Sequence, residues 1–259
     1  MDFSQTIFFD VEQRFSKYNT QKWMNMWWTF CFYISAVYVV IVHWGQNLMT
    51  NRKKFYLRRP LFLWNLTLAC FSAIGFYRVG GKFLDDLERY GWHQTICSLE
   101  WLEGQSGLWC ALFGYSKVLE LLDTSFIILR KQKLIFLHWY HHITVLCFCW
   151  YAYIYPHGQG RVFIVMNYFV HTIMYAYYAI RAQGLVRIPL AANIAITCLQ
   201  LSQMVFGVAT FVDAFLMLQT GVACNVEYMN ILIGLGMYVS YAILFSRFFY
   251  LTYVKREKK

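Results

Sequence analysis

Residues 134–155 read LIFLHWYHHITVLCFCWYAYIY and contain no Asp, Glu, Lys or Arg. A helix of this length crosses the hydrocarbon core of a bilayer. Its first half carries His138, His141 and His142 at spacing i, i+3, i+4, which places the three imidazoles on one side of the helix. Because ionisable side chains inside a membrane span are costly and usually functional, the stretch predicts a membrane helix that carries a buried polar site.

The rest of the chain shares this apolar character. Of its 259 residues, 59% are hydrophobic and 14% are charged, against roughly 45–50% and about 25% in soluble domains. With only 3 prolines and no low-complexity tract, we expect one domain, 1–259, without a linker or a cleavable signal peptide. The fold class is an all-α polytopic membrane protein with seven transmembrane helices. The predicted spans are about 27–46, 60–80, 107–129, 134–155, 162–180, 189–217 and 230–252.

The basic residues predict how the chain crosses the membrane. The formal net charge is +10, and Lys and Arg concentrate in the loops 51–59 and 130–133 and in the C-terminal tail. By the positive-inside rule, these segments and the C-terminus are cytosolic and the N-terminus is luminal. The charge is therefore explained by this topology and by anionic membrane lipids, and we expect no nucleic acid partner.

Cysteines fit the same topology. Cys97 and Cys224 fall in loops on the predicted luminal side, whereas the other six lie inside predicted spans. An oxidising lumen permits a disulfide between Cys97 and Cys224, and two free thiols are the alternative.

Polar residues in other predicted spans lie at the depth of the three histidines. With a rise of 1.5 Å per residue, counting from the cytosolic loops puts all of them in one layer of the cytosolic half. They are Lys117, Glu120 and Asp123 in the third span, Asn167, His171, Tyr175 and Tyr178 in the fifth, and Gln200 and Gln203 in the sixth. Four helices that place polar groups at one depth predict a single cavity, open to a cytosolic reactant.

Less specific interpretations stay open for each group. Lys117 and Glu120 can form an ion pair that lets a polar helix insert, and the glutamines can tie helices together. A metal-dependent lipid desaturase or hydroxylase also uses histidine boxes, although the four histidines in this layer are too few to ligate two irons. A seven-span receptor or transporter would share the topology.

Four motifs resemble those of the very-long-chain fatty acid elongases, the ELO family. Residues 117–124, KVLELLDT, resemble KxxExxDT, and residues 138–142, HWYHH, resemble HxxHH. Residues 167–178, NYFVHTIMYAYY, match NxxxHxxMYxYY, and residues 197–200, TCLQ, match TxxQ. The resemblance covers about residues 25–254, and the stretch 129–145 is most similar to the branch that acts on saturated and monounsaturated chains, including the palmitate-to-stearate elongase.

The resemblance implies an activity and a fold. Elongases are 3-oxoacyl-CoA synthases of the endoplasmic reticulum membrane. They condense a long-chain acyl-CoA with malonyl-CoA and release CoA and CO₂. Six of their seven helices surround a narrow acyl tunnel that is closed at its luminal end. No metal and no cofactor beyond the co-substrate malonyl-CoA is expected. A homodimer and a complex with the ketoreductase, dehydratase and enoyl reductase of the elongation cycle are expected partners.

The resemblance also implies roles for individual residues. His141 would carry the acyl group as an acyl-imidazole, with His171 facing it and His138 and His142 orienting it or moving protons. Glu120 and Asp123 would fix imidazole tautomers, and Lys117 would balance their charge. The expected substrate-binding residues are Thr124, Asn167, Tyr175, Tyr178, Gln200 and Gln203 in the cavity, and Arg130, Lys131, Lys133, Arg181, Arg187 and the basic tail around the CoA phosphates. Phe148, Phe169 and Val205 would line the acyl chain.

Overall fold

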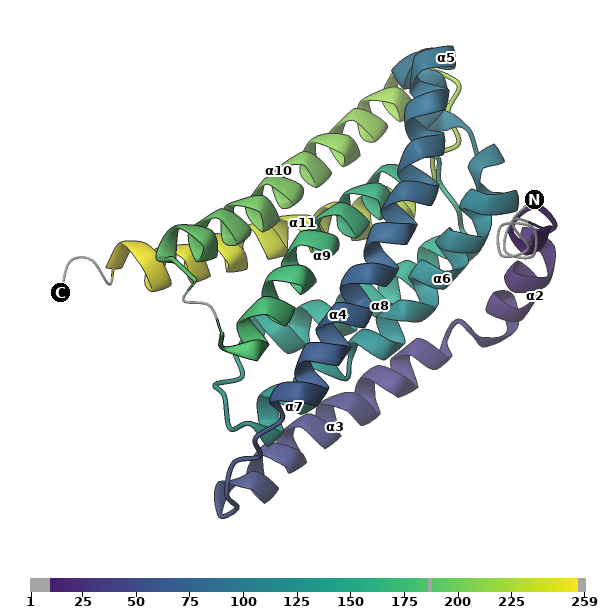
Figure 1. The fold of residues 1–259 in the computed structure, drawn as a ribbon. Coiled ribbons are helices and arrows are strands. Elements are labelled where there is room, and N and C mark those ends of the chain that lie inside the picture. Colours follow the sequence, from purple (N-terminus) through teal and green to yellow (C-terminus); the bar gives the residue numbers. More distant parts are fainter. Residues whose placement is uncertain (1–9, 186–187, 256–259) are drawn as a thin grey trace, which may run out of the picture.

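A computed structural model describes residues 10–185 and 188–255, which contain helices and loops and no strand (Figure 1). A short helix, α2 (Lys17–Trp27), precedes the first long one. The long helices are α3 (Phe30–Thr50), α4 (Arg58–Gly75), α5 (Gly81–Cys97), α6 (Gly104–Glu120), α8 (Phe136–Ile154), α9 (Gly160–Gln183), α10 (Leu190–Thr220) and α11 (Tyr228–Phe249). Short elements complete the order: η1 (Phe76–Gly80), η2 (Glu100–Leu102), α7 (Asp123–Leu129) and η3 (Tyr250–Val254).

Five helical stretches among the described residues are long and apolar enough to cross a membrane. They are Phe30–Thr50, Arg58–Cys97, Gly160–Gln183, Leu190–Thr220 and Tyr228–Val254. The third and fourth predicted spans correspond to α6 with α7 and to α8, where the buried charges and the histidines lower the hydropathy. The chain is a multi-pass membrane protein, and the count of seven spans stays a prediction.

Six helices enclose the centre of the molecule. Helix α4 packs on α9, α9 on α10, α10 on α11, α11 on α8, and α8 on α6, which returns to α4 at η1. Helix α3 lies outside this ring, against α8 and α7. Figure 1 shows α3 along one side of the bundle and α10 with α11 along the other.

Small residues let these helices approach closely. A methyl group at Gly75 of α4 would lie 2.4 Å from the Tyr168 ring of α9, and one at Gly207 of α10 would lie 2.2 Å from the Tyr238 ring of α11. Such distances are impossible for real atoms, so any larger residue would force the helix pairs apart. Close backbone approach across small residues is a common way for membrane helices to associate.

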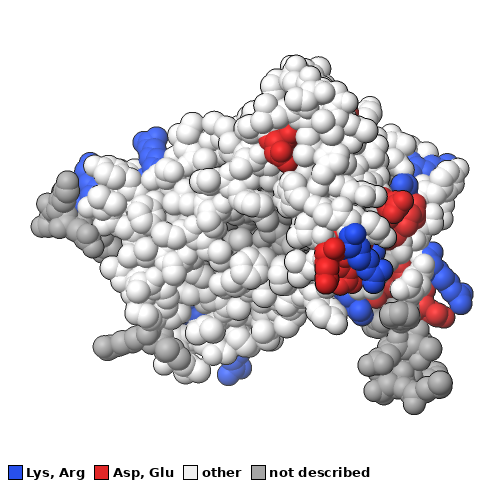
Figure 2. Space-filling view, turned by 90° about the horizontal axis from the view of Figure 1, so that it is seen from above, with Lys and Arg blue, Asp and Glu red and all other residues white. Residues whose placement is uncertain are grey.

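The surface of the bundle is divided into zones. Charged residues gather towards its two ends, with few in the broad band between them (Figure 2). Apolar side chains are exposed on the helices, among them Val40, Val205 and Ile243, whose exposed fractions are 67%, 66% and 62%. Because a soluble protein rarely exposes so continuous an apolar surface, this band is the part that faces lipid.

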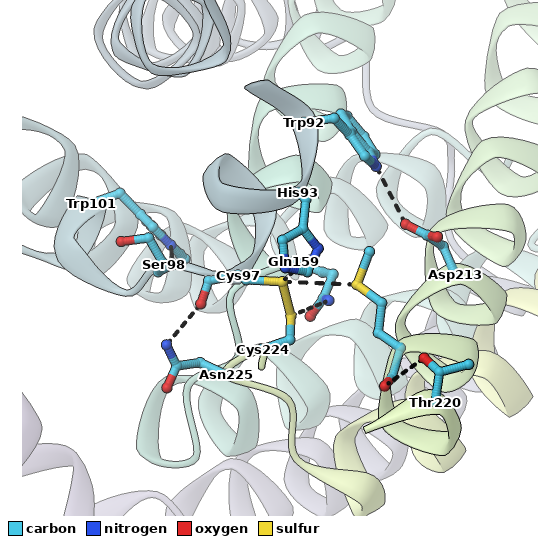
Figure 3. The surroundings of a disulfide bond; sticks show 11 residues. Trp92, His93, Cys97, Ser98, Trp101, Gln159, Asp213, Thr220, Cys224 and Asn225 are labelled. Carbon is cyan, nitrogen blue, oxygen red and sulfur yellow. Dashed lines mark hydrogen bonds between the residues drawn. A yellow bond between two sulfur atoms is a disulfide. The ribbon is translucent and has the colours of Figure 1, made fainter. Parts of the chain in front are cut away.

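A disulfide crosslinks the end of the bundle where α5 lies. Cys97, the last residue of α5, is bonded to Cys224 in the loop between α10 and α11, with an S–S distance of 2.04 Å (Figure 3). This is the pair that the sequence allowed. Helix α5 was not predicted as a helix, because Lys82, Asp86 and other charged residues interrupt the repeat of apolar residues along it. Gly91, with a φ of 73°, also breaks the helix.

Candidate functional site

A polar chamber lies inside the ring of helices, at the level of the histidines. It receives side chains from the C-terminal end of α6, the start of α7, and α8, α9 and α10, so the residues that the sequence placed in one layer do meet. Its polar lining consists of Glu120, Asp123, His138, His141, His142, Asn167, His171, Tyr175, Tyr178, Gln200 and Gln203.

The most deeply buried charges of the site belong to an ion pair on α6. Lys117 and Glu120 are 2% and 3% exposed, and Lys117 Nζ donates to Glu120 Oε1 at 2.7 Å. Lys117 Nζ also donates to Asn167 Oδ1 on α9 at 3.0 Å, and Ser116 Oγ donates to the same Glu120 oxygen at 3.0 Å. Lys117 therefore lies behind the chamber wall, where it balances Glu120 and links α6 to α9.

The same network reaches His171. Asn167 Nδ2 lies 3.2 Å from His171 Nε2, and His171 Nδ1 lies 3.9 Å from Glu120 Oε2. Because an amide N–H can only donate, His171 Nε2 is the acceptor and the ring proton resides on Nδ1, which faces the carboxylate. Glu120 thus favours one tautomer of His171, as an acidic partner does in a catalytic triad.

The three histidines of α8 have different surroundings. His138 Nε2 lies 3.0 Å from the hydroxyl of Thr124, which also bonds Tyr38 of α3 at 2.5 Å. The His142 ring is buried 4.5 Å from that of His138, and its Nδ1 has no hydrogen-bond partner among the described residues. Thr124, which is not part of the chamber lining, therefore orients His138 from behind. Tyr38 is a second contact that the sequence did not indicate.

His141 is less buried than His142. Its ring lies 4.9 Å from that of Tyr241 on α11, and no hydrogen bond holds its imidazole within the described ranges. Tyr241 instead donates to the backbone carbonyl of His141 at 3.3 Å and contacts Thr144 at 2.5 Å. An imidazole that is packed but not hydrogen-bonded keeps its nitrogen lone pair for a ligand in the chamber.

The predicted role of Asp123 as a partner of an imidazole is wrong. Asp123 Oδ1 accepts from Trp64 Nε1 of α4 at 2.5 Å, and Oδ2 accepts from the Tyr175 hydroxyl of α9 at 2.7 Å. Both carboxylate oxygens are thus used to join α4, α7 and α9. Trp64 was missed because one tryptophan in an aromatic-rich span carries no pattern of its own.

A second cavity adjoins the chamber at the end of the bundle where α7 and the C-terminus lie. Its walls include Asp123, His138, Tyr175 and Tyr178, which also line the chamber, together with Arg130 and Arg181. Two guanidinium groups at the mouth of a polar cavity suit phosphate groups, which arginine binds with two parallel hydrogen bonds.

Other predicted phosphate-binding residues are placed differently. Lys131 is not among the residues that line the mouth, and its Nζ donates to the carbonyls of Thr50 and Arg52 at 3.1 Å each, which holds the α3–α4 loop. Lys133 is exposed beside the mouth and is not among its lining residues. Arg187 and the tail from Arg256 onward lie outside the described residues.

On its other side the chamber leads to an apolar tunnel. Asn167 lines both cavities, and beyond it the walls are Cys110, Phe113, Gly114, Val145, Phe148, Cys149, Ala152, Tyr153, Phe163, Ile164, Met237 and Tyr238. The expectation for Phe148 is confirmed. Those for Phe169 and Val205 are wrong, because their side chains are 41% and 66% exposed on the outer surface.

The chamber, the mouth and the tunnel form one path through the bundle. Two arginines stand at one end, five helices contribute polar groups at the centre, and mainly apolar walls follow beyond Asn167. The shape fits a ligand with an anionic head, a reactive centre and a long hydrocarbon tail. Among the described residues, no group of three His, Cys, Asp or Glu is placed to hold a metal ion.

Comparison with known proteins gives a consistent result over almost the whole chain. A family model described as "ELO: GNS1/SUR4 family" matches residues 23–259. The "Very long chain fatty acid elongase 6" of Drosophila melanogaster is 43% identical over 262 residues, which cover 98% of this chain and 83% of the relative. The protein of the same name from Homo sapiens is 42% identical over 252 residues, or 97% of this chain and 94% of the relative. A "Putative fatty acid elongase 3" from Caenorhabditis elegans is 40% identical over 256 residues, with coverages of 98% and 80%.

Proposed function

The chain belongs to the ELO family of fatty acid elongases, and we propose that it is the condensing enzyme, or 3-oxoacyl-CoA synthase, of fatty acid elongation. It joins a long-chain acyl-CoA to malonyl-CoA and gives a 3-oxoacyl-CoA two carbons longer, CoA and CO₂. The observation that carries the proposal is the path from a basic mouth, through a chamber of histidines, into an apolar tunnel. Only a substrate with a phosphate-bearing head, a thioester and a hydrocarbon tail uses all three parts.

The first half-reaction places the acyl group on His141. The free imidazole nitrogen attacks the thioester carbonyl, a C–N bond forms, and the C–S bond breaks as CoA leaves as a thiol. The ring proton moves through a neighbouring imidazole, for which the His142 ring, with its centroid 5.6 Å from that of His141, is the nearest choice. The product is an acyl-imidazole, which is an activated acyl donor.

The second half-reaction forms the new carbon–carbon bond. Malonyl-CoA loses CO₂, and the electron pair of the broken C–C bond gives an enolate that attacks the acyl carbonyl. The C–N bond to His141 then breaks, its electron pair returns to the ring nitrogen, and a proton taken up from water restores the neutral imidazole. Asn167 lies where the polar chamber meets the tunnel, and the second N–H of its amide is suited to donate to the thioester or enolate oxygen. His171, whose Nε2 accepts from the same amide and whose Nδ1 faces Glu120 at 3.9 Å, holds Asn167 in place.

The tunnel also supports a preferred substrate length. From His141 to the end of α8 at Ile154, a rise of 1.5 Å per residue gives roughly 20 Å, which an extended chain of about sixteen carbons spans. This agrees with saturated or monounsaturated chains of palmitate size. It does not require a bent polyunsaturated chain.

The proposed location is the endoplasmic reticulum membrane. The Cys97–Cys224 disulfide supports a luminal position for the α5 end of the bundle, since disulfides persist in oxidising compartments. The mouth with Arg130 and Arg181 is then cytosolic, which is where acyl-CoA and malonyl-CoA are present. A homodimer and contacts with the other enzymes of the elongation cycle remain part of the proposal.

A single incubation tests this function. Purified protein is mixed with palmitoyl-CoA and radiolabelled malonyl-CoA, without iron or NADPH, and we expect a labelled 3-oxoacyl-CoA two carbons longer. Absence of product across a range of chain lengths from folded protein would refute the proposal.

A variant and a trapping experiment test the nucleophile. His141→Ala should abolish product formation. With palmitoyl-CoA alone, the intact enzyme should release CoA and carry the acyl group on the peptide that contains His141. An acylated peptide from another part of the chain would overturn the role of His141 while leaving the overall reaction in place.

A further inference from the structure

The luminal end of the tunnel is closed by loops and a short turn, not by the long helices. The residues at this floor are Trp101 and Leu102 of η2, Pro156 and His157 of the α8–α9 loop, and Gly160 at the start of α9. The imidazole of His157 is buried beside the stacked rings of Phe163 and Phe211, with its centroid 6.2 and 6.3 Å from theirs. Because loops are held less firmly than helices, something must fix this floor against a chain that presses on it.

Hydrogen bonds tie the α8–α9 loop to the disulfide. Gly158 N donates to Asn225 O at 2.8 Å, and Asn225 in turn donates to Cys97 O from its backbone at 3.3 Å and from its side chain at 2.7 Å. Gln159 Nε2 lies 3.5 Å from Cys224 Sγ. Figure 3 shows Gln159 and Asn225 on the two sides of the Cys97–Cys224 bond.

The part of the floor formed by η2 is also held by the segment around Cys97. Trp101 Nε1 donates to Ser98 O at 3.0 Å, and Ser98 directly follows Cys97. Gly158 packs so closely on this segment that a methyl group there would lie 2.1 Å from the carbonyl oxygen of Ile96. Both halves of the floor therefore rest on the Cys97 segment, which the disulfide crosslinks to a loop 127 residues further along the chain.

From these contacts we infer that the Cys97–Cys224 disulfide, with Asn225, is a positioning element that sets the longest acyl chain the enzyme accepts. The inference rests on the proposed function. A tunnel rejects a longer chain only if its floor resists displacement, since each methylene that fits into an apolar pocket favours binding about 10- to 200-fold. The crosslink holds the floor, whereas the catalytic chamber lies roughly 20 Å away along α8 and is unaffected.

The test compares substrates of different length in the wild-type protein and three variants. The variants are Cys97→Ser/Cys224→Ser, which removes the crosslink, and Asn225→Ala, which removes only the side-chain bond to Cys97 O. The control is Glu12→Ala, which removes luminal contacts to Trp109 at 2.8 Å and Arg78 at 3.2 Å, neither of which lines the tunnel. The measurements are kcat/KM for palmitoyl-CoA and for arachidoyl-CoA and the lengths of all products.

The expected result is a change in selectivity, not only in amount. The double serine variant should keep its palmitoyl-CoA activity and raise the ratio of arachidoyl- to palmitoyl-CoA kcat/KM by roughly tenfold. Asn225→Ala should show a smaller rise, and Glu12→Ala should lower thermal stability with an unchanged ratio.

Each outcome has a separate meaning. An unchanged ratio in a folded double serine variant overturns the inference, as does an equal rise in Glu12→Ala. If the double variant does not fold, Asn225→Ala decides alone, and an unchanged ratio there is equally refuting. Failure of the wild-type protein to elongate palmitoyl-CoA would instead refute the proposed function.

Discussion

The ion pair between Lys117 and Glu120 permits a test that separates structure from catalysis. Both side chains are almost completely buried, and Lys117 Nζ is shared between Glu120 at 2.7 Å, Asn167 at 3.0 Å and the face of the Phe113 ring at 4.1 Å. In Lys117→Met the carboxylate keeps only the hydroxyl of Ser116 as a partner. An uncompensated buried charge then remains inside the bundle.

The expected cost follows from this loss. Removing one partner of a buried ion pair destabilises a protein by about 3–5 kcal/mol. For a domain of this size, that lowers the melting temperature by roughly 10 °C. In Lys117→Met/Glu120→Gln no charge remains, so the cost falls to about 1–3 kcal/mol for the unpaired Asn167 oxygen. The double variant should therefore be more stable than Lys117→Met alone.

The variants should rank differently in activity than in stability. Glu120 faces Nδ1 of His171, and glutamine cannot supply the negative charge that favours the tautomer with its proton on Nδ1. The double variant should thus recover stability without recovering elongation. The assays are thermal unfolding in detergent, followed by tryptophan fluorescence, and product formation from palmitoyl-CoA. A double variant that is as unstable as the sum of the two single variants, or one that regains activity with stability, would refute the reasoning.

Three further predictions address the mouth, the chamber and the floor. Arg130→Ala and Arg181→Ala should each raise KM for malonyl-CoA roughly five- to tenfold with kcat retained, and the rise in KM should be smaller at high salt. Lys131→Ala should leave KM unchanged. Steady-state kinetics at two ionic strengths measure these effects. Tyr175→Phe removes the 2.7 Å bond to Asp123 and should cost about 1.5–3 kcal/mol in thermal unfolding, as expected for a hydrogen bond to a charged group. Burial lowers the pKa of His157, in the α8–α9 loop, to about 4. Because the unfolded chain binds this proton at about pH 6.5, stability should fall by roughly 3 kcal/mol between pH 6.5 and 4, and melting temperatures across this range should lose that dependence in His157→Phe.

Spacing and depth were sufficient to predict the main elements and the polar layer. The stretch 134–155 became α8 (Phe136–Ile154), and polar residues from four predicted spans line one chamber. Both predictions use only the helical rise and the cost of charge in a bilayer. Those quantities do not depend on how neighbouring helices pack.

The direction of individual side chains was harder to predict. Phe169 and Val205 were expected in the tunnel, yet each lies two residues from an inward-facing residue, Asn167 and Gln203. Two residues are about 200° of rotation on an α-helix, so both side chains point outward. The same periodicity would have corrected the expectation, because the polar residue fixes the inward face.

Contacts between helices had no signal in a single sequence. Asp123 was paired with an imidazole because both occur in the same layer, but its oxygens accept from Trp64 and Tyr175. The hydroxyl of Tyr241 and the Asn225 contact to Cys97 O likewise depend on which helices and loops are neighbours. With 20% aromatic residues in the chain, no one of them stands out before the packing is known.

The polar side chains of the site divide by how completely their hydrogen bonds are satisfied, and this division explains their roles. Lys117, Asp123 and Asn167 each have at least two hydrogen-bond partners, and at least one of these partners is on another helix. Their polarity is therefore used to hold the chamber open inside an apolar bundle. Neither His141 nor His142 has a hydrogen bond to its ring among the described residues, although burying an unsatisfied polar group costs about 1–3 kcal/mol. A functional site tolerates this cost because a bound ligand supplies the missing hydrogen bond. His141 is the less buried of these two imidazoles and is therefore the one better placed to bond the acyl group.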